Sequence, residues 1–474
     1  MTTRPDPRLA TAVLASRIVA GGLRRAGRGG GTALPGLIAN RIDPRVLDKL
    51  AARLSDGVIV VAGTNGKTTT SRMLAQMLET DGRVIAHNRS GSNLVRGVTA
   101  ALADQVQRAG KRKPTVGVIE SDENALPEIV RRTHPRVLLL LNLFRDQLDR
   151  YGELETIAAH WRPVIANLPP STTLIVNADD PNLAALAATT NARVLTFGLN
   201  DAGATLDGLP HASDAAICRI CESPLVYDAL FIAHLGAWRC PQCGNARPPL
   251  DVSASQIRVE SMERLFMQAT RTSGTPPTLD IELTLPGIYN AYNALAAISV
   301  ASVIGLSDRS VTSSLRSFQP AFGRLERVEY HGRTLTLALA KNPTGFNELI
   351  RTVASSGWVG PVVIGINDLD ADGRDVSWLW DVDFERLADL PNVPRLLTAG
   401  IRGDDMAVRM LYAGMPQERI DATAAGRPLA DALQHLEQST SPGDQVMVLL
   451  TYTAMLEFRK ALAASGAVAD FWEQ

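Results

Sequence analysis

The sequence predicts an α/β protein with a parallel sheet and a phosphate-binding loop, an inserted four-cysteine zinc ribbon, and a C-terminal Rossmann-like α/β domain. Three observations support this prediction. Short apolar runs that end in polar residues alternate with helical patterns, as in a parallel sheet covered by helices. The stretch GTNGKTTT lies between one such run and a helix, and two Cys-x-x-Cys pairs interrupt the alternation.

Length and composition limit the class of protein. A chain of 474 residues is too long for one hydrophobic core, so two or three domains are expected. The net charge of −1 gives no general attraction to nucleic acid. Arginine dominates the 48 basic residues, so a lysine at a position where chemistry needs one is informative.

The N-terminal segment is basic, and we predict a surface helix there. The alternative is contact with an anionic membrane. No run of about twenty apolar residues is present, which argues against a transmembrane helix. Arg17 interrupts the apolar stretch and no clear cleavage site follows, so no signal peptide is expected. We expect a cytoplasmic protein that works at the inner face of the membrane if this segment binds lipid.

The elements follow in order along the chain. Residues 56–78 predict a strand, a glycine turn and a helix. Further strands are predicted within 114–121, 135–142 and 171–180, and helices within 98–107, 180–189 and 285–301. A second α/β pattern has strands within 360–368, 393–400 and 444–453. We predict a basic segment at 1–45, an ATP-binding domain at 46–323 with an insertion at about 205–252, and a C-terminal domain at 324–474.

The loop from Gly63 to Thr70 has the features of a phosphate cradle. Backbone N–H groups at a helix start attract anions, and the helix dipole adds to that attraction. Lys67 supplies a charge for the β- and γ-phosphates, and the Thr68 hydroxyl can bind Mg²⁺. The first glycine of the usual motif would fall at Val61, so the loop is a shortened variant. The predicted nucleotide contacts are Gly63, Thr64, Asn65, Gly66, Lys67, Thr68 and Thr69.

Magnesium needs a second hard oxygen ligand. Glu120 ends a predicted strand, at the edge where α/β sheets place ligands. Asp122 and Glu123 are alternatives, and a solvated acidic loop competes with these two.

Several motifs resemble the Mur ligase family over residues 45–470. They are GTNGKTTT, the glutamate after the strand, LNLFRDQLDRYGE, VNADDPN, PGIYNAYNALAA and FGRLE. The resemblance implies a ligase that activates a carboxylate as an acyl phosphate with ATP and Mg²⁺, so that an amine can attack it. It also implies site residues: Lys67, Thr68 and Glu120 for phosphate and magnesium, Asn290 and Asn293 for adenine, Arg324 for nucleotide, with Asn177 and Asp179 matching the NADD motif.

Two departures separate the chain from the amino-acid-adding Mur ligases. Gln147 replaces the histidine that usually follows the aspartate in DQLDR. Those enzymes often use a carbamylated lysine in the central domain, yet no lysine occurs between Lys113 and Lys341. A standard amino-acid-adding activity is therefore disfavoured.

Four cysteines predict a structural zinc site. Cys218 and Cys221 form one pair and Cys240 and Cys243 the other, and these are all the cysteines of the chain. Two such knuckles complete a thiolate tetrahedron with no position for water. Disulfides, the alternative, are disfavoured in the cytoplasm. The segment lacks the basic and aromatic cluster of a nucleic-acid-binding ribbon.

A zinc ribbon in this context, with NRSGSNLVRGVTAAL, LALAKNPTGFNE and ADGRDVSWLWDVDFE, is similar to the MurT branch of the family, the synthetase subunits of lipid II isoglutaminyl synthases. The resemblance implies amidation of the D-glutamate α-carboxylate in the lipid II stem peptide, with ammonia from a GatD-type glutaminase. A partner is also expected from the residues if glutamine is the donor. Glutamine hydrolysis of this class needs a cysteine nucleophile, and all four cysteines are assigned to metal.

The stretch DLDADGRDVSWL begins like an EF-hand calcium loop. Its twelfth residue is Leu379 where calcium needs a bidentate glutamate, so we reject that interpretation. The resemblance implies instead that Asp375 completes the Cys–His pair of the partner glutaminase. From the residues alone, a solvated acidic loop is the alternative for the whole stretch. We expect Asp372 to shape the turn. Trp378 and Trp380, with two alternating aspartates, predict a strand edge or an interface patch.

Three alternatives stay open at this point. A Mur ligase or folylpolyglutamate synthase would add an amino acid. A nucleotide-binding scaffold with a zinc module would recruit partners without chemistry. A zinc-ribbon nucleic-acid binder would show steeply salt-dependent binding.

Overall fold

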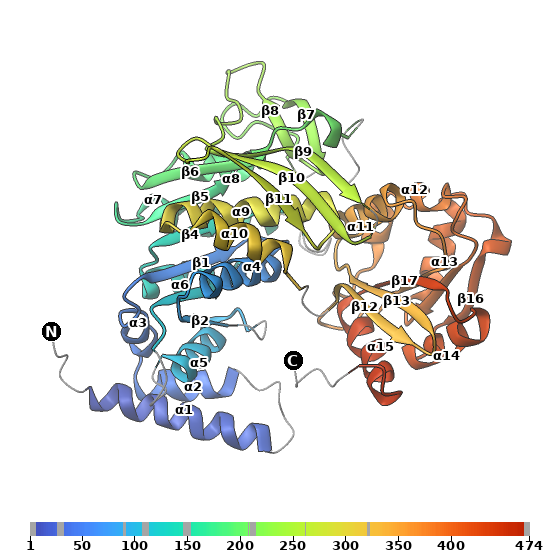
Figure 1. Ribbon diagram of the computed structural model, residues 1–474, viewed down its shortest axis with the longest axis horizontal. Helices are drawn as coiled ribbons and strands as arrows, with labels where there is room; N and C mark the ends of the chain where they lie inside the picture. The colour runs from blue at the N-terminus through green and yellow to red at the C-terminus, as the bar shows by residue number, and fades with distance from the viewer. Residues whose placement is uncertain are drawn as a thin grey trace.

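The computed structural model describes residues 6–25, 33–88, 92–106, 113–145, 153–206, 208, 215–260, 262–319 and 323–468. Within these residues the chain forms sheets of nine, six and two strands. Figure 1 shows the nine-stranded sheet with its helices beside the six-stranded part, which is drawn in orange and red.

The nine-stranded sheet carries the phosphate loop near its centre. Its order is β11-β10-β9-β6-β5-β4-β1-β3-β2, parallel from β2 to β9 and antiparallel for β10 and β11. The strands are β1 (Gly57–Ala62), β2 (Ile85–His87), β3 (Val116–Glu120), β4 (Val137–Leu140), β5 (Thr173–Asn177), β6 (Arg193–Leu199), β9 (Val252–Glu260), β10 (Arg264–Arg271) and β11 (Thr278–Leu283). The four strands predicted in this half, β1, β3, β4 and β5, are confirmed, whereas β2, β6 and β9 to β11 were not predicted.

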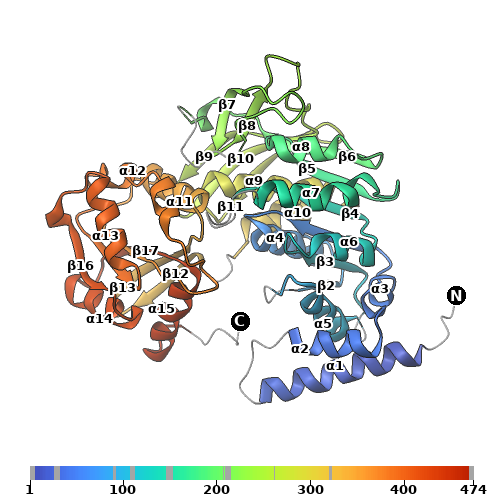
Figure 2. The ribbon, with the colours of Figure 1, turned by 180° about the vertical axis from the view of Figure 1, so that it is seen from behind.

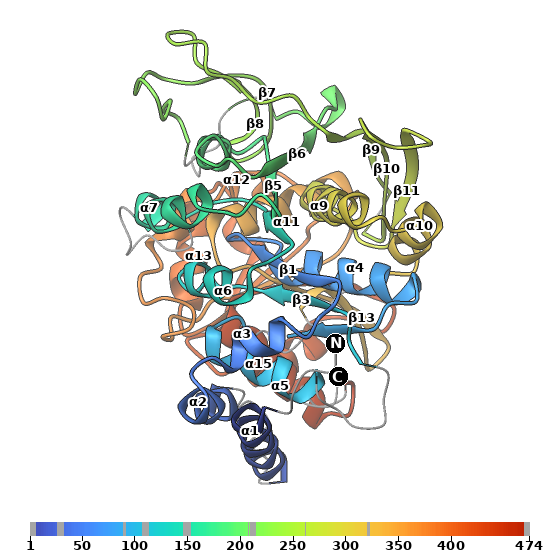
Figure 3. The same ribbon diagram turned by 90° about the vertical axis from the view of Figure 1, so that its left-hand side faces the viewer.

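Helices cover both faces of this sheet, which explains why its parallel strands are continuous apolar runs. Apolar side chains of α4 (Lys67–Thr80), α9 (Ile288–Ile304) and α10 (Asp308–Arg316) pack on one face. The other face is covered by α3 (Val46–Ala51), α5 (Val95–Gln105), α6 (Leu126–Thr133), α7 (Glu153–Ala166) and α8 (Pro181–Ala187). The two layers are seen from behind in Figure 2 and from the side in Figure 3.

The basic N-terminal segment forms a surface helix, as predicted. α1 (Pro7–Arg25) and α2 (Ala33–Ile42) lie at the end of the molecule beside α5. α1 buries Leu9, Ala12 and Val13 and exposes Leu14 and Ile18. Among the described residues, no helix is long and apolar enough to cross a membrane.

The six-stranded sheet has the order β12-β13-β17-β14-β15-β16. Its strands are β12 (Arg324–Tyr330), β13 (Arg333–Leu339), β14 (Val362–Gly365), β15 (Leu396–Gly400), β16 (Ile420–Ala425) and β17 (Gln445–Leu450). β12 is antiparallel to β13, and the remaining pairs are parallel. The predicted Rossmann-like pattern is confirmed, although the β12–β13 hairpin and β16 were not predicted.

Helices also cover both faces of the second sheet. One face carries α11 (Pro343–Ser355), the 3₁₀ helix η3 (Ser377–Asp381), α12 (Glu385–Ala388) and α13 (Gly403–Tyr412). The other carries α14 (Leu429–Ser439) and α15 (Tyr452–Ala464). The domain boundary near Gly323 stays a prediction, and the chain enters this sheet at Arg324.

A small two-stranded sheet, β7 (Val226–Ile232) and β8 (Leu235–Arg239), lies in the segment between β6 and β9. Two short 3₁₀ helices, η2 (Ala202–Ala204) and η4 (Gln417–Arg419), complete the described elements. The two-stranded sheet contacts the main body through Trp238, whose indole N–H donates to the Ala178 carbonyl at 3.0 Å.

Candidate functional site: a phosphate loop and a cysteine cluster

The loop between β1 and α4 places the start of a helix at the carboxyl edge of the nine-stranded sheet. Gly66, directly before α4, has φ = 87°, a left-handed conformation that favours glycine. A Cβ atom at this position would lie 2.2 Å from the Asn293 Oδ1. The chain therefore turns sharply here, and α4 begins with Lys67 pointing back over the loop.

Lys67 is held by the loop itself and by an acidic neighbour. Its ammonium group donates to the Gly63 and Thr64 carbonyls and forms a 2.8 Å ion pair with Glu123. The side chain is only 10% exposed. The charge is thus localised at the helix start, where an incoming phosphate would compete with Glu123 for it.

Glu120 lies beside the loop because β3 pairs with β1 in parallel, with Glu120 opposite Val61. Its Oε1 accepts a 3.1 Å hydrogen bond from the Thr68 hydroxyl. Burial raises the pKa of Glu120, while the nearby charges of Lys67 and Arg324 act to lower it. A carboxylate and a hydroxyl at this separation are hard oxygen donors that suit Mg²⁺.

Asp122 and Glu123, the two alternative magnesium ligands, make other contacts. Glu123 is engaged with Lys67, and Asp122 Oδ1 accepts from the Asn124 backbone N–H at 3.0 Å. Of the three acids, Glu120 contacts the predicted magnesium ligand Thr68. This geometry favours Glu120 over Asp122 and Glu123 as the candidate magnesium ligand.

The asparagines of α9 are buried behind the loop, not on a helix surface. The Thr70 hydroxyl donates to Asn293 Oδ1 at 3.3 Å, and Asn293 Nδ2 donates to Asn290 Oδ1 at 3.0 Å. Asn290 Nδ2 in turn donates to the Pro286 carbonyl at 2.7 Å. The two predicted adenine contacts thus form one hydrogen-bonded chain that ends at α4.

Arg324 comes from the second sheet but acts on the same site. It begins β12, and its charge interacts with Glu120 and with Tyr289, the residue before Asn290. Burial lowers the pKa of the Arg324 guanidinium, and these two groups oppose the shift. Residues predicted from motifs more than 250 positions apart are therefore brought together.

Two asparagines that hold the loop were not predicted. Asn142 follows β4; its Oδ1 accepts the Asn65 N–H at 2.8 Å and its Nδ2 donates to the Asn65 carbonyl at 3.1 Å. Asn342, before α11, donates to the Asn65 Oδ1 at 3.3 Å. Asn142 could have been predicted as a site residue, because it directly follows an apolar run that ends at the sheet edge. Gln147 lies outside the described residues.

The NADD residues support the fold next to the site. Asn177 Nδ2 donates to the Leu141 carbonyl, and Asp179 accepts from Arg247 at 2.8 Å and from the Tyr292 hydroxyl at 2.6 Å. Burial raises the pKa of Asp179 to about 6, opposed mainly by the Arg247 charge. Arg247 belongs to the segment that carries the cysteines.

The aspartates after β14 do not form a calcium loop. Asp368 pairs with Arg402, and Asp370 pairs with Arg374. Asp372 is buried and accepts from the Thr453 backbone N–H at 2.8 Å, at the start of α15. The prediction that Asp372 shapes the turn is thus extended, because it also fixes this helix end.

Asp375 lies on the surface three residues further on. It is exposed, and its Oδ1 accepts from the Ser377 backbone N–H at 2.8 Å. The predicted strand edge after it is wrong, since residues 377–381 form η3. Trp378 is 1% exposed and packs in the core against Phe346, so it is not part of an interface patch. Trp380 is 53% exposed and contacts the exposed ring of Tyr412.

The four cysteines converge as predicted. Their sulfur atoms all lie within 4.8 Å of one another, with 3.6 Å from Cys218 to Cys243 and 3.4 Å from Cys221 to Cys240. These separations exclude disulfides, whose sulfurs are ~2 Å apart. A tetrahedral zinc with bonds of about 2.3 Å places its sulfurs at about 3.8 Å. The cluster could therefore hold zinc.

Comparison with known proteins decides the family. Residues 61–217 match the Mur ligase middle domain, and residues 339–455 match the MurT ligase C-terminal domain. The MurT subunit of lipid II isoglutaminyl synthase (glutamine-hydrolyzing) from Streptococcus pneumoniae is 32% identical over 93% of this chain and 94% of its own length. The chain belongs to the MurT family. The MurT subunit of Staphylococcus aureus strain N315 is 30% identical over 81% of this chain and 83% of its own.

Solved structures support the fold of this MurT family member. MurF from Acinetobacter baumannii has a TM-score of 0.64 at 19% identity, covering 93% of this chain and 81% of MurF. A pseudomurein peptide ligase type C from Methanothermus fervidus has a TM-score of 0.63 at 19% identity, covering 88% of this chain and 80% of the ligase. The chain therefore has the Mur ligase fold.

Proposed function

We propose that this chain is the ATP-dependent synthetase subunit of a lipid II isoglutaminyl synthase. As a carbon–nitrogen ligase with glutamine as amide donor, it would convert the D-glutamate α-carboxylate of the lipid II stem peptide to the amide of D-isoglutamine. The observation that carries this proposal is the similarity to MurT subunits over nearly the whole chain.

The chemistry explains the phosphate loop. A carboxylate is a poor electrophile, because its negative charge repels a nucleophile. Transfer of the γ-phosphoryl group from ATP makes an acyl phosphate, and ammonia then displaces inorganic phosphate. Lys67, the N–H groups at the start of α4 and Arg324 would stabilise the negative charge during transfer. Asn290 and Asn293 would position the adenine.

Magnesium and zinc have separate roles in this proposal. Thr68 and Glu120 would hold Mg²⁺, which neutralises phosphate charge. The four cysteines would hold Zn²⁺ in a closed, structural site. The residues fit each ion, because the first set offers hard oxygens and the second offers four thiolates.

Ammonia would come from a GatD-type glutaminase subunit in a heterodimer. The chain has four cysteines, all in the cluster, and therefore no thiol for glutamine hydrolysis. The exposed carboxylate of Asp375 would orient the histidine of the partner's Cys–His pair. Trp380, five residues after Asp375, and Tyr412, whose ring contacts that of Trp380, are both exposed and would form part of the contact surface.

The substrate is lipid-anchored, so the chain would work at the cytoplasmic face of the membrane. α1 is basic and exposes Leu14 and Ile18, which suits peripheral contact with an anionic bilayer.

The test is amidation of purified lipid II by the chain co-purified with the small glutaminase, with glutamine and ATP. The product should show the small mass change of OH-to-NH₂ replacement. Lys67→Ala should abolish the reaction even with ammonium salts, because the phosphoryl group can no longer be transferred. Gain of a whole amino acid residue would indicate an amino-acid-adding ligase, and absence of ATP turnover with lipid II would indicate a scaffold.

A further inference from the structure

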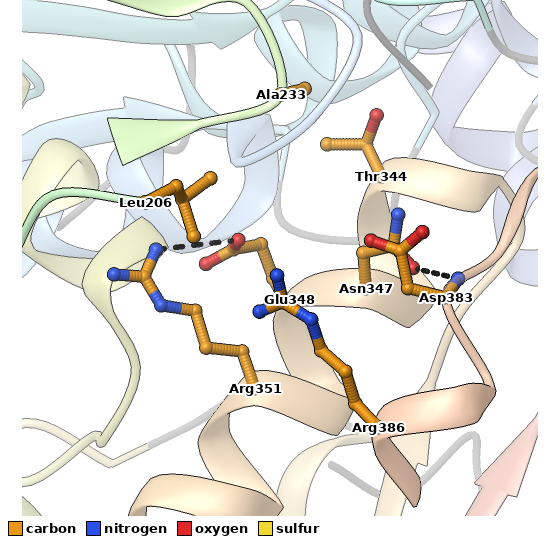
Figure 4. Close-up of a pocket in the computed structure, with 8 residues that line it drawn as sticks. All are labelled: Leu206, Ala233, Thr344, Asn347, Glu348, Arg351, Asp383 and Arg386. Carbon is orange, nitrogen blue, oxygen red and sulfur yellow. Dashed lines mark hydrogen bonds and ion pairs between the residues drawn. The ribbon is translucent and has the colours of Figure 1, made fainter. Parts of the chain in front are cut away.

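A pocket lies between α11 and α12 of the six-stranded part and the segment that precedes β9. Thr344, Asn347, Glu348 and neighbouring polar residues line one side, and Leu206 and Ala233 line the other (Figure 4). It has room for a molecule about the size of water. The pocket is separate from the phosphate loop, and nothing proposed above uses it.

Glu348 is the unusual group in this pocket. It is 6% exposed, its Oε1 lies 3.8 Å from Arg351 Nη1, and its Oε2 has no hydrogen-bond partner among the described residues. The Asn347 side chain accepts from the Asp383 N–H at 2.8 Å, but its Nδ2 also lacks a partner there. Buried polar groups without a partner are destabilising, so two adjacent ones point to a ligand.

The side chains that line the pocket indicate the chemistry of that ligand. A carboxylate with a free oxygen accepts hydrogen bonds, which suits a small cation or a neutral N–H donor. The charged groups of the lining are two carboxylates, Glu348 and Asp383, and two guanidinium groups, Arg351 and Arg386. The Arg351 guanidinium is already bonded to the Phe231 and Ala204 carbonyls, so it does not make the pocket an anion site. Burial raises the pKa of Glu348 to about 7, opposed by the charges of Arg351 and Arg386, which makes it a stronger base than an exposed glutamate.

The pocket lies between the two chemical centres of the proposed enzyme. α11 begins next to the phosphate loop, where Asn342 contacts Asn65. Glu348 is six residues further along the helix, a rise of about 9 Å. On the other side, Asp383 follows η3, the short helix directly after Asp375.

We propose that this pocket receives the ammonia for the amidation, with Glu348 binding it as ammonium and taking its proton. This inference rests on the proposed function. Ammonium transfers one proton to the Glu348 carboxylate. The neutral ammonia then leaves the pocket for the acyl phosphate at the phosphate loop. There the nitrogen lone pair forms the C–N bond to the acyl carbon, the C–O bond to phosphate breaks, and phosphate leaves with that electron pair. The nitrogen loses one further proton to the departing phosphate.

The experiment uses the complex without glutamine and varies ammonium chloride at saturating ATP and lipid II. Glu348→Gln keeps the shape but removes the charge and the base. We expect its KM for ammonium to rise about ten- to a hundredfold, the effect of losing one charge-assisted hydrogen bond, with the KM for ATP unchanged. Glu385→Gln on α12, outside the pocket lining, is the matched control and should behave as wild type.

A second variant guards against a folding defect at position 348. Leu206→Trp would fill the pocket from the opposite wall and should raise the ammonium KM in the same way. If wild type amidates with ammonium while Glu348→Gln or a folded Leu206→Trp keeps the wild-type ammonium KM, the pocket assignment is wrong. If wild type amidates with neither ammonium nor glutamine, the proposed function itself fails.

Discussion

At the scale of single residues, lysine scarcity was a good guide. Lys67 stood out in a chain rich in arginine, and it lies at the start of α4 as predicted. Its ion pair with Glu123 could not be predicted, because that contact depends on the pairing of β3 with β1. Local sequence thus indicates which residue can do the chemistry, while the sheet determines what that residue touches.

The aspartates after β14 differ in burial in a way that local sequence does not indicate. Asp372 and Asp375 are three residues apart in one acidic stretch, and composition alone does not indicate which of them is buried. The fold buries Asp372 against Thr453 at the start of α15 and leaves Asp375 exposed. The same limit explains the error at Trp378, whose alternation with Trp380 comes from a 3₁₀ helix with one buried and one exposed side.

Asp375→Asn should separate the two half-reactions of the complex. Asparagine cannot stabilise a charged histidine, so glutamine-dependent amidation should fall by about 10⁴, as for other orienting aspartates, while ammonium-dependent amidation is kept. Steady-state rates with each nitrogen source measure this. Asp370→Asn, an exposed aspartate of the same loop, is the control. Wild-type glutaminase turnover in the Asp375→Asn complex would remove Asp375 from the mechanism.

At the scale of elements, most of the parallel strands were predictable, because strands buried on both faces are continuous apolar runs. The parallel strands β2, β6 and β16 were missed. The run from β9 to β11, which pair with one another in antiparallel fashion, and the β12–β13 hairpin were also missed. Their alternating side chains are polar on one side, as the partly exposed pattern of β9 shows, and such strands resemble loops in composition. The cysteine cluster was predictable, because four ligands at fixed spacing leave few arrangements.

The position of the cysteine-containing segment against the body was not predictable. Arg247 pairs with buried Asp179, which also accepts from Tyr292 between Asn290 and Asn293 on α9. The segment therefore contacts, through one carboxylate, the helix that carries the predicted adenine contacts. The segment that carries the cysteine cluster is therefore linked to α9 through Arg247 and Asp179.

Cys240→Ser should release the metal and loosen this contact. We expect the free energy of unfolding to fall by about 3 kcal/mol, the lower end for breaking a buried ion pair, and the KM for ATP to rise. Metal analysis, thermal unfolding and ATP kinetics measure these effects. Arg239→Ala, which removes a surface pair of β8, is the control. A metal-free Cys240→Ser protein with wild-type stability and ATP affinity would contradict a structural role for the cluster.

At the scale of the whole molecule, the site is built from both large sheets. The first supplies the phosphate loop, Glu120 and Asn142, while the second supplies Arg324 and Asn342. Contacts of this range depend on how the two sheets pack together, which no local pattern encodes. Family motifs identified the residues, but their convergence is a property of the fold.

The central claim is that the γ-phosphoryl group of ATP, bound at the loop that holds Lys67, is transferred to the acceptor carboxylate. The most direct test labels the D-glutamate α-carboxylate of lipid II with ¹⁸O and follows the label during amidation with ammonium and ATP. An acyl phosphate predicts that one ¹⁸O atom appears in inorganic phosphate for each amide formed. Unlabelled phosphate at full amidation would contradict the account.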